Sequence, residues 1–232
     1  MVTIKNTHVY NLGASVVASG NAMRIEPQEV TEETFQKSME RAIKLASIGG
    51  GTGHSNFRTG ILVSFDLKYP QYFTKQLQRY HWIQYVSSTS MMHRITKMDF
   101  SKCCNKYVSK DTISRMNMFV NLYDKLTTAG MKFWEIVEQD YVPVLKYCYG
   151  NDFEPFSDDT TRGEVLYDCY MRIVSNCPMG AELWVHVTTN YEQLATIYKQ
   201  RKEHKLKEDW GYFCNWIESL PYAKELICNF AN

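Results

Sequence analysis

Ile61-Leu-Val-Ser-Phe-Asp-Leu67, with Pro70 three residues further on, reads as a strand that leads into a helix. Every second residue from Ile61 to Leu67 is apolar, which is the period of a strand with one buried face. Pro70 suits the first turn of a helix. The residues that would line one side of that helix are Phe73, Gln76, Leu77 and Tyr80.

A second strand followed by a helix is predicted nearer the C-terminus. Leu183, Val185 and Val187 recur at every second position, again the period of a strand. Asn190 then suits a helix N-cap, and Gln193 completes an Asn-x-x-Gln capping box.

Helices account for most of the remaining chain. Residues 31–48 are predicted to form a helix with Thr31 as its N-cap. Further helices are predicted over 112–147 with a break near Gly130, and over 163–175, 209–219 and 222–230. Residues 83–96 are ambiguous. Few strands and many helices indicate an α+β fold, which we expect to form a single domain over 1–232.

Composition and charge restrict the class of protein. The 232 residues carry 26 Lys and Arg against 25 Asp and Glu, a formal charge of +1 with His neutral. Apolar residues at 44% and charged residues at 22% exclude a disordered or fibrous chain. The balanced charge argues against a partner of polymeric nucleic acid. No stretch approaches the ~20 apolar residues of a membrane helix, so no membrane partner is expected.

Cysteine usage and targeting signals indicate a cytoplasmic protein. Met1–His8 lacks the basic and apolar regions of a secretion signal. The seven cysteines are odd in number and none are spaced Cys-x-x-Cys, so free thiols are expected rather than disulfides or a zinc site. Motifs for a Ser or Cys nucleophile or for metal hydrolysis are also missing, and we predict no metal.

Two arginines fall on apolar helix faces. Arg201 lies seven residues after Leu194, and Arg172 lies seven residues after Val165. A guanidinium on a buried face is costly unless it meets an anion or several acceptors. Each arginine therefore contacts an anionic ligand or forms an internal ion pair, and the stem of Arg201 has the further option of reaching solvent.

Two other segments have both a functional and a structural interpretation. Residues 76–94 are dense in hydrogen-bonding and aromatic side chains, and Ser87-Ser-Thr-Ser90 precedes His93-Arg94. They suit a phosphate and a base or flavin, or simply form a polar loop. Gly49-Gly-Gly-Thr-Gly53 brings backbone amides close to a phosphate, or only ends a helix.

Taken in order, these segments resemble the flavin-dependent thymidylate synthases. That family shows Gly-His-Ser/Thr-x-Phe-Glu-His before a strand, here Gly53-His54-Ser55-Asn56-Phe57-Arg58-Thr59. It then has a helix with Gln-x-x-Arg-His-Arg, here Gln76-Leu77-Gln78-Arg79-Tyr80-His81, and a loop that here ends in Ser90-Met91-Met92-His93-Arg94.

The resemblance continues through the second half of the chain. The family's Ala-Arg before Leu-Pro is similar to Met171-Arg172 before Cys177-Pro178. Its Asn-x-Arg after a strand, and its helix ending in Leu-Arg, are similar to Asn190-Tyr191-Glu192 and Gln200-Arg201. The matches span roughly residues 35–220 in the family's order, as expected of a divergent member of the phage or low-GC bacterial kind.

The resemblance implies both architecture and reaction. It implies an α+β subunit with a central mixed or antiparallel sheet, in a homotetramer whose FAD sites form where subunits meet. The implied reaction is FAD-dependent C5 methylation, or hydroxymethylation, of a pyrimidine deoxynucleotide monophosphate, most simply dUMP to dTMP, with NADPH and methylenetetrahydrofolate as co-substrates. No protein nucleophile is implied, because the site orients and polarises the uracil ring. A dCMP-type substrate remains open.

The resemblance also assigns roles to residues. The implied nucleotide-contacting residues are Gln76, Arg79, Ser90, Arg94, Arg172 and Arg201. The implied cofactor-contacting residues are Ser55, Arg79, His81, Asn190 and His204. Arg201 is the residue implied to act in catalysis.

Several family positions are altered in this chain. The acid after the Phe is Arg58, the Arg-His-Arg triplet is Arg79-Tyr80-His81, the Asn-Glu of the loop is replaced by Ser87 and Ser88, and the Arg after Asn190 is Glu192. A carboxylate beside a diphosphate weakens binding by more than tenfold if uncompensated, because charge-assisted hydrogen bonds contribute ~1.5–3 kcal/mol. We therefore predict that Arg58 and Glu192 face each other.

Three functions remain open from the sequence. The first is the FAD-dependent enzyme described above. The second is a nucleotide- or flavin-binding protein of the same fold that has lost catalysis, which the altered triplet and Glu192 favour. The third is an unrelated α+β enzyme in which the ordered matches are chance.

Overall fold

The computed structural model describes residues 1–48, 53–150 and 156–229. The chain divides into two compact units, which we call the sheet unit (Met1–Ser88 with Leu183–Asn232) and the helical unit (Thr89–Glu182). Each unit is considered by itself below. The expectation of one domain over 1–232 stays a prediction, and the predicted glycine turn at Gly49–Thr52 lies outside the described residues.

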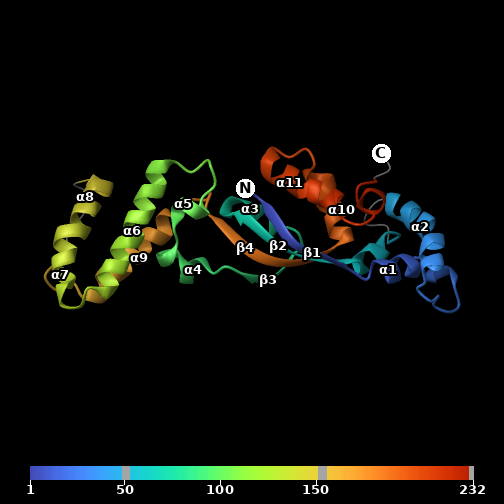
Figure 1. Ribbon diagram of the computed structural model, residues 1–232, viewed down its shortest axis with the longest axis horizontal. Coiled ribbons are helices and arrows are strands. Elements are labelled where there is room, and N and C mark those ends of the chain that lie inside the picture. Colours follow the sequence, from blue (N-terminus) through green and yellow to red (C-terminus); the bar gives the residue numbers. More distant parts are fainter. Residues whose placement is uncertain (49–52, 151–155, 230–232) are drawn as a thin grey trace. The chain divides into compact units, whose positions relative to one another are not determined.

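A four-stranded sheet forms the centre of the sheet unit (Figure 1). Its strands are β1 (Thr3–Tyr10), β2 (Leu62–Pro70), β3 (Gln84–Ser88) and β4 (Glu182–Asn190), in the order β1-β2-β4-β3. β1 pairs antiparallel with β2, and β3 pairs antiparallel with β4. The α+β class and the central sheet predicted from the sequence are therefore confirmed.

The two strands predicted from alternation are the two central ones. In β2, Val63, Phe65 and Leu67 are completely buried, as the two-residue period predicts. In β4, Val185 and Val187 are buried in the same core, whereas Leu183 is only partly buried. Central strands carry the clearest apolar pattern because helices cover their inward face.

The strand β1 was not predicted, because its sequence carries no apolar alternation. Its residues are Thr-Ile-Lys-Asn-Thr-His-Val-Tyr, and Lys5 to His8 are exposed. The pairing with β2 is irregular between Lys5 and His8, where Asn6 has a φ of 50°. An irregular, polar edge strand is typical of sheets that avoid pairing with other chains.

The helices of the sheet unit include the predicted ones, although Leu12–Ala18 was not predicted and the helix predicted over 222–230 is the short Ala223–Leu226. They are α1 (Leu12–Ala18), α2 (Glu32–Ser47), α3 (Gln71–Leu77), α10 (Tyr191–Arg201), α11 (Lys207–Glu218) and α12 (Ala223–Leu226), with 3₁₀ turns at Asn21–Met23 and Asn56–Gly60. The helix predicted from Pro70 ends at Leu77, so Tyr80 lies in the turn beyond it.

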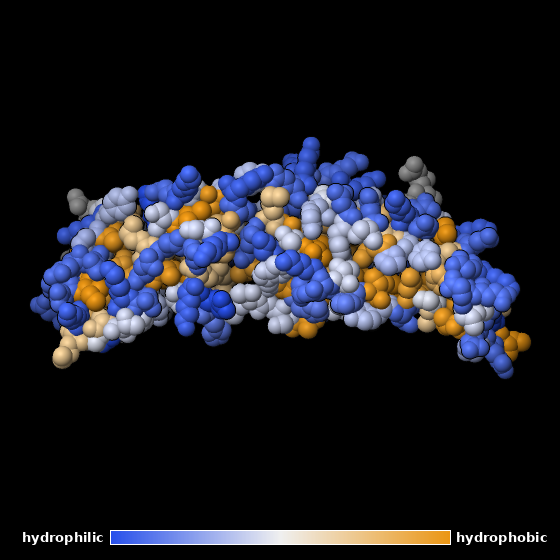
Figure 2. Space-filling view, viewed as in Figure 1, coloured by the Kyte–Doolittle hydropathy of each residue, from blue (hydrophilic) through white to orange (hydrophobic). Residues whose placement is uncertain are grey.

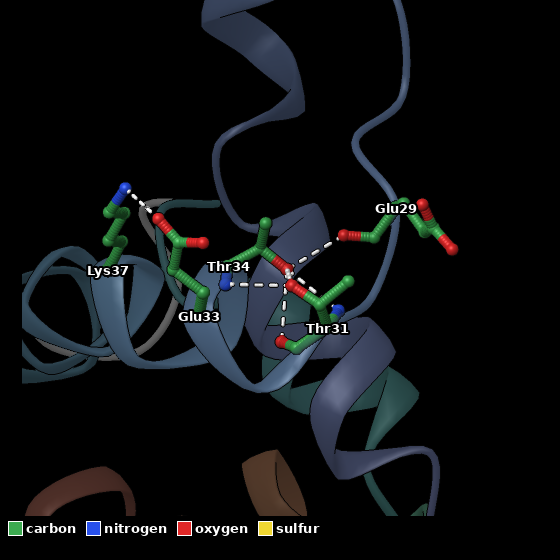
Figure 3. A network of polar contacts seen from close by, with 5 residues as sticks. All are labelled: Glu29, Thr31, Glu33, Thr34 and Lys37. Carbon is green, nitrogen blue, oxygen red and sulfur yellow. Dashed lines mark hydrogen bonds and ion pairs between the residues drawn. The ribbon is translucent and has the colours of Figure 1, made fainter.

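The N-terminus of α2 has the predicted cap (Figure 3). Thr31 Oγ1 accepts a hydrogen bond from the backbone N–H of Thr34, and Thr34 Oγ1 accepts one from the backbone N–H of Thr31. This capping box satisfies two backbone donors that a helix end leaves unpaired. Phe35, Met39 and Ala42 then point into the core, as the helical period predicts.

The N-terminus of α10 forms only half of its predicted capping box. Asn190 Oδ1 accepts from the backbone N–H of Gln193 at 2.9 Å. The side chain of Gln193 does not return to Asn190, because its Oε1 accepts from the backbone N–H of Trp82 at 3.0 Å. Gln193 thereby ties α10 to the turn that follows α3.

Aromatic side chains fill the core between the sheet and α11. Trp210 and Phe213 of α11 are completely buried. The Trp210 ring lies 4.4 Å from the Phe73 ring, and the Phe213 ring lies 6.1 Å from the Phe65 ring, measured between centroids. Each such ring buries a large apolar area, which fixes α11 against β2 and α3.

The helical unit consists of helices packed around a second core. They are α4 (Met91–Arg94), α5 (Phe100–Cys103), α6 (Lys110–Thr128), α7 (Phe133–Ile136), α8 (Val142–Tyr149) and α9 (Arg162–Asn176), with 3₁₀ turns at Ile95–Lys97 and Gly130–Lys132 and a π-helical turn at Val137–Tyr141. The predicted break near Gly130 is confirmed, and Gly130 has a φ of 55°.

Most of the surface seen in Figure 2 is hydrophilic, with hydrophobic residues in small patches. Among the residues described, no helix is long and apolar enough to cross a membrane. None of the seven cysteines forms a disulfide.

A buried ion pair joins three segments of the sheet unit. The Arg58 side chain is 2% exposed, and its Nε and Nη2 both lie 2.6 Å from Glu192 Oε2. Arg58 Nη1 also donates to the carbonyl of Leu226 at 3.0 Å. The predicted compensation between Arg58 and Glu192 is confirmed, because each residue supplies the charge that the other requires.

Removing this pair should destabilise the fold. We expect Glu192→Gln to lower the free energy of unfolding by about 3 kcal/mol, because it leaves the buried Arg58 without its counter-charge. Urea denaturation followed by circular dichroism measures this change. Glu33→Gln is the control, since the Lys37–Glu33 pair is exposed and its loss should cost under about 1 kcal/mol. Equal effects of the two substitutions would contradict a stabilising role for the buried pair.

Candidate functional site

A groove on the sheet unit brings together basic and amide side chains from two distant segments. Its volume is about 560 Å³, within the range of small-molecule sites. We call it the basic groove. It is lined by Arg79, Tyr80, His81, Gln193, Thr196, Gln200 and Arg201. None of these lining residues is acidic.

The basic groove forms where the turn after α3 meets one side of α10. α3 ends at Leu77, and the turn is closed by backbone hydrogen bonds from Tyr80 to Leu77 and from Ile83 to Tyr80. Tyr80 Oη then donates to Gln200 Oε1 at 3.1 Å. Together with the bond between Trp82 and Gln193, this contact holds the turn along the length of α10.

Arg201 is held by neutral groups. Its Nε donates to Tyr80 Oη at 2.6 Å, and its guanidinium lies 4.7 Å from the centre of the Trp210 ring. No carboxylate of the described chain lies within ion-pair distance of it. Of the interpretations of Arg201, the internal ion pair therefore finds no partner among the described residues. The contacts orient the guanidinium by hydrogen bonding and cation–π attraction and leave its charge uncompensated.

The titratable neighbours of Arg201 respond to burial and to its charge. Burial raises the pKa of Tyr80, although Arg201 opposes the shift, so Tyr80 stays a neutral phenol. Burial lowers the pKa of His204, and the charges of Arg201 and Lys205 lower it further. The His204 Nδ1 accepts from the backbone N–H of Leu206 at 3.1 Å, a contact that requires the unprotonated nitrogen.

The sequence-predicted nucleotide residues of the sheet unit have different surroundings. Arg79 and Arg201 line the same groove although they are 122 residues apart in sequence. Gln76 is not among the residues that line the groove, and its Oε1 accepts from Trp210 Nε1 at 2.8 Å. Gln76 therefore also positions the indole ring against which Arg201 rests.

The other predicted nucleotide residues belong to the helical unit. Arg172 makes a bidentate pair with Asp168, at 2.7 Å from Nε and 3.0 Å from Nη2, so the ion-pair interpretation holds for this arginine. Ser90 caps α4 by accepting from the backbone N–H of His93 at 3.4 Å. Arg94 is exposed at the end of that helix. The ligand contacts of these residues stay predictions.

The predicted cofactor residues are spread over the sheet unit. Ser55 and Asn190 are buried, at 1% and 5% exposed, and Asn190 also caps α10. His81 is exposed and lines the basic groove with Arg79. His204 is half-buried, with its ring 6.1 Å from that of Trp210. Their contacts with a flavin stay predictions.

Gln193, Thr196 and Gln200 line the basic groove but were not predicted as site residues. They recur at spacings of three and four along α10, which is the signal that could have identified a second, polar face on that helix. For metal ions, the described residues contain no group of three or more potential ligands.

Solved structures show which fold this is. The flavin-dependent thymidylate synthase ThyX from Helicobacter pylori, complexed with FAD and dUMP, aligns with a TM-score of 0.56 at 15% identity over 97% of both chains. The UMP/dUMP methylase PolB from Streptomyces cacaoi, bound with 5-Br dUMP, aligns with a TM-score of 0.52 at 11% identity, over 99% of this chain and 95% of PolB. No family model and no curated protein sequence matches.

The chain therefore has the fold of the flavin-dependent thymidylate synthases, as the sequence resemblance predicted. The alignments cover nearly the whole chain and count against the alternative of an unrelated α+β enzyme whose ordered matches are chance.

The environment of His204 can be tested by titration. We expect its pKa to lie below 6.5, and we expect Arg201→Gln to raise it, because one of the charges that disfavour the imidazolium is removed. NMR titration of the imidazole resonances measures both values. A lowered native pKa means that the unfolded chain binds the proton more tightly, so this group's contribution to stability declines as the pH falls through about 6.5. Lys202→Gln, one residue along, serves as the control; a pKa equally unaffected by both substitutions would contradict the coupling.

Proposed function

We propose that this protein is an FAD-dependent enzyme that methylates, or hydroxymethylates, C5 of a pyrimidine deoxynucleotide monophosphate, most simply dUMP. The observation that carries the proposal is the basic groove, in which Arg79 and Arg201 converge without an acidic lining residue. A nucleotide monophosphate supplies the dianion that such a pair of guanidinium groups requires. The shared fold with proteins crystallised with dUMP or 5-Br dUMP supports the same substrate class.

Arg201 is the residue that we assign to catalysis. Tyr80 and Trp210 orient its guanidinium without neutralising it, so its charge remains available to a ligand. A fixed positive charge beside the pyrimidine stabilises negative charge that develops on the ring when C5 reacts. Arg79 binds the phosphate in this scheme, and the proposal gives Ser90, Arg94 and Arg172 further nucleotide contacts.

The chain's residues also fit a bound FAD. Glu192 would repel the flavin's diphosphate, but Arg58 neutralises its carboxylate at 2.6 Å. The residues proposed to hold the cofactor are Ser55, Arg79, His81, Asn190 and His204. FAD, when bound, supplies the redox chemistry that no side chain of this protein provides. The protein's residues bind and orient the two ligands and keep Tyr80 protonated.

Further parts of the proposal rest on the same fold. NADPH is the proposed reductant and methylenetetrahydrofolate the proposed carbon donor. We also propose a homotetramer in the cytoplasm.

A second candidate function is nucleotide or flavin binding without turnover. The Arg58–Glu192 pair favours binding without turnover, because both residues stand where the flavin-dependent thymidylate synthases have residues that they use around their flavin. The two functions differ in one measurement, the release of tritium from [5-³H]dUMP in the presence of FAD, NADPH and methylenetetrahydrofolate. Release above background supports the enzyme, whereas dUMP binding without release supports the binding protein.

The nucleotide site is tested by calorimetry with dUMP. We expect Arg201→Gln to weaken dUMP binding by about 10- to 150-fold, which corresponds to the ~1.5–3 kcal/mol of a charge-assisted hydrogen bond. Lys202→Gln removes the same charge from the adjacent position and should leave the affinity within about twofold. Equal affinities of the wild type and Arg201→Gln for dUMP would remove the basic groove from the proposal.

A further inference from the structure

One face of α10 lines the basic groove with neutral polar side chains. Gln193, Thr196 and Gln200 recur there at spacings of three and four residues, so the Cβ atoms of neighbouring members lie about 5–6 Å apart. An amide or a hydroxyl group can donate or accept a hydrogen bond. The contacts that each side chain makes within the protein therefore decide which role is left for a ligand.

The contacts of Gln200 leave it as a hydrogen-bond donor. Because Arg201 Nε donates to Tyr80 Oη at 2.6 Å, the single proton of the phenol points elsewhere, to Gln200 Oε1 at 3.1 Å. Burial raises the pKa of Tyr80, which keeps that proton in place. The amide oxygen of Gln200 is therefore turned toward Tyr80. Its NH₂ group is turned away, and among the described residues it has no acceptor, so it is available to a ligand.

The contacts of Thr196 leave it as a hydrogen-bond acceptor. Its Oγ1 donates to the backbone carbonyl of Glu192 at 3.2 Å, one turn earlier in α10. A hydroxyl group has one proton and two lone pairs, so the proton is used inside the helix and the lone pairs remain. Thr196 is exposed and lines the basic groove, where its oxygen can accept from a ligand.

The alternative is that Gln200 and Thr196 are ordinary solvated side chains of a surface helix. A solvated glutamine has no fixed orientation, whereas Gln200 is held by the same phenol that holds Arg201. Gln193 shows how a glutamine that supports the fold looks on this face: it is 6% exposed, and its Oε1 accepts from the backbone N–H of Trp82. Gln200 is oriented although it is exposed, which points to a ligand rather than to the core.

Uracil and cytosine differ at two neighbouring atoms that such a pair of side chains can read. Uracil presents a donor at N3–H and an acceptor at O4, whereas cytosine presents an acceptor at N3 and a donor at its 4-amino group. Thr196 and Gln200 present an acceptor one turn away from a donor, which complements uracil and opposes cytosine at both atoms. A base of the wrong polarity leaves polar groups of the site unpaired, and this cost is what gives a hydrogen-bonding site its selectivity.

We propose that Thr196 and Gln200 are specificity-determining residues that select uracil over cytosine, the hydroxyl by accepting from N3–H and the amide by donating to O4. The inference rests on the proposed function, in which Arg201 lies beside the pyrimidine ring. Gln200 follows Arg201 in reach because Tyr80 joins the two side chains, so both meet the same part of the ligand. Tyr80 is a positioning residue in this scheme, since it acts through the Gln200 amide.

Calorimetry of the full chain with FAD present gives the affinities for dUMP and dCMP, and their ratio is the readout. We expect the wild type to bind dUMP about tenfold more tightly than dCMP, or better. Gln200→Leu and Thr196→Val should each lower this ratio by about 3- to 10-fold, because each removes one hydrogen bond that only uracil makes. Gln78→Leu is the matched control and should leave the ratio within about twofold, since Gln78 is an exposed glutamine just after α3 that does not line the groove.

Two further variants test polarity and positioning. Gln200→Glu replaces the donor by an acceptor, and it should move the ratio further toward dCMP than Gln200→Leu does. Tyr80→Phe removes the hydroxyl that orients the amide, so it should lower the ratio although Gln200 itself is unchanged. Circular dichroism shows that each variant is folded.

The outcomes separate this inference from the proposed function. If the wild type binds dUMP but does not prefer it to dCMP, the inference is wrong and the proposed function stands. The same holds if Gln200→Leu weakens both nucleotides equally, because Gln200 then contacts the phosphate or the sugar. A ratio unchanged by Gln200→Leu or by Thr196→Val also overturns the inference. Binding of neither nucleotide to the wild type contradicts the proposed function and the inference together.

Discussion

The helix α10 is fixed by guanidinium groups at both of its ends. Arg58 holds Glu192 in the first turn, where a carboxylate also meets the positive end of the helix dipole. Arg201 ends the helix against Tyr80 and Trp210, where a cation meets the negative end. The basic groove lies along this helix, so its geometry depends on both contacts. Burial away from water makes an unpaired guanidinium costly, so each of these two groups must meet a partner.

The Arg58–Glu192 pair also explains how this sequence can differ from the flavin-dependent thymidylate synthases that it resembles and still have their fold. Arg58 and Glu192 are each unfavourable alone, because either would leave a charge unpaired beside the start of α10. Together they satisfy one another and reach the carbonyl of Leu226, which joins α12 to the same point. The two substitutions therefore act as one unit. Coupling of this kind permits very low sequence identity with the same architecture.

Sequence reasoning succeeded where a local pattern reports burial directly. The alternation in β2 and β4 and the cap of α2 predicted their structures, because one buried face or one backbone donor decides each. It failed for β1, whose pairing is long-range and whose side chains are polar. Sequence reasoning also failed to distinguish Arg172 from Arg201, because each lies seven residues after an apolar residue on the same helix face. Only the position of Asp168 one turn before Arg172 distinguishes an ion pair from an available charge.

Three arginines of this chain can be ordered by the groups that satisfy them. Arg172 has a carboxylate within its own helix, and Arg58 has one from a distant helix. Arg201 has a phenol and an indole face. Support from the protein decreases along this series, while the electrostatic gain from an added anion increases. Among the described residues Arg201 has no carboxylate partner, so the proposed nucleotide monophosphate would compensate its charge.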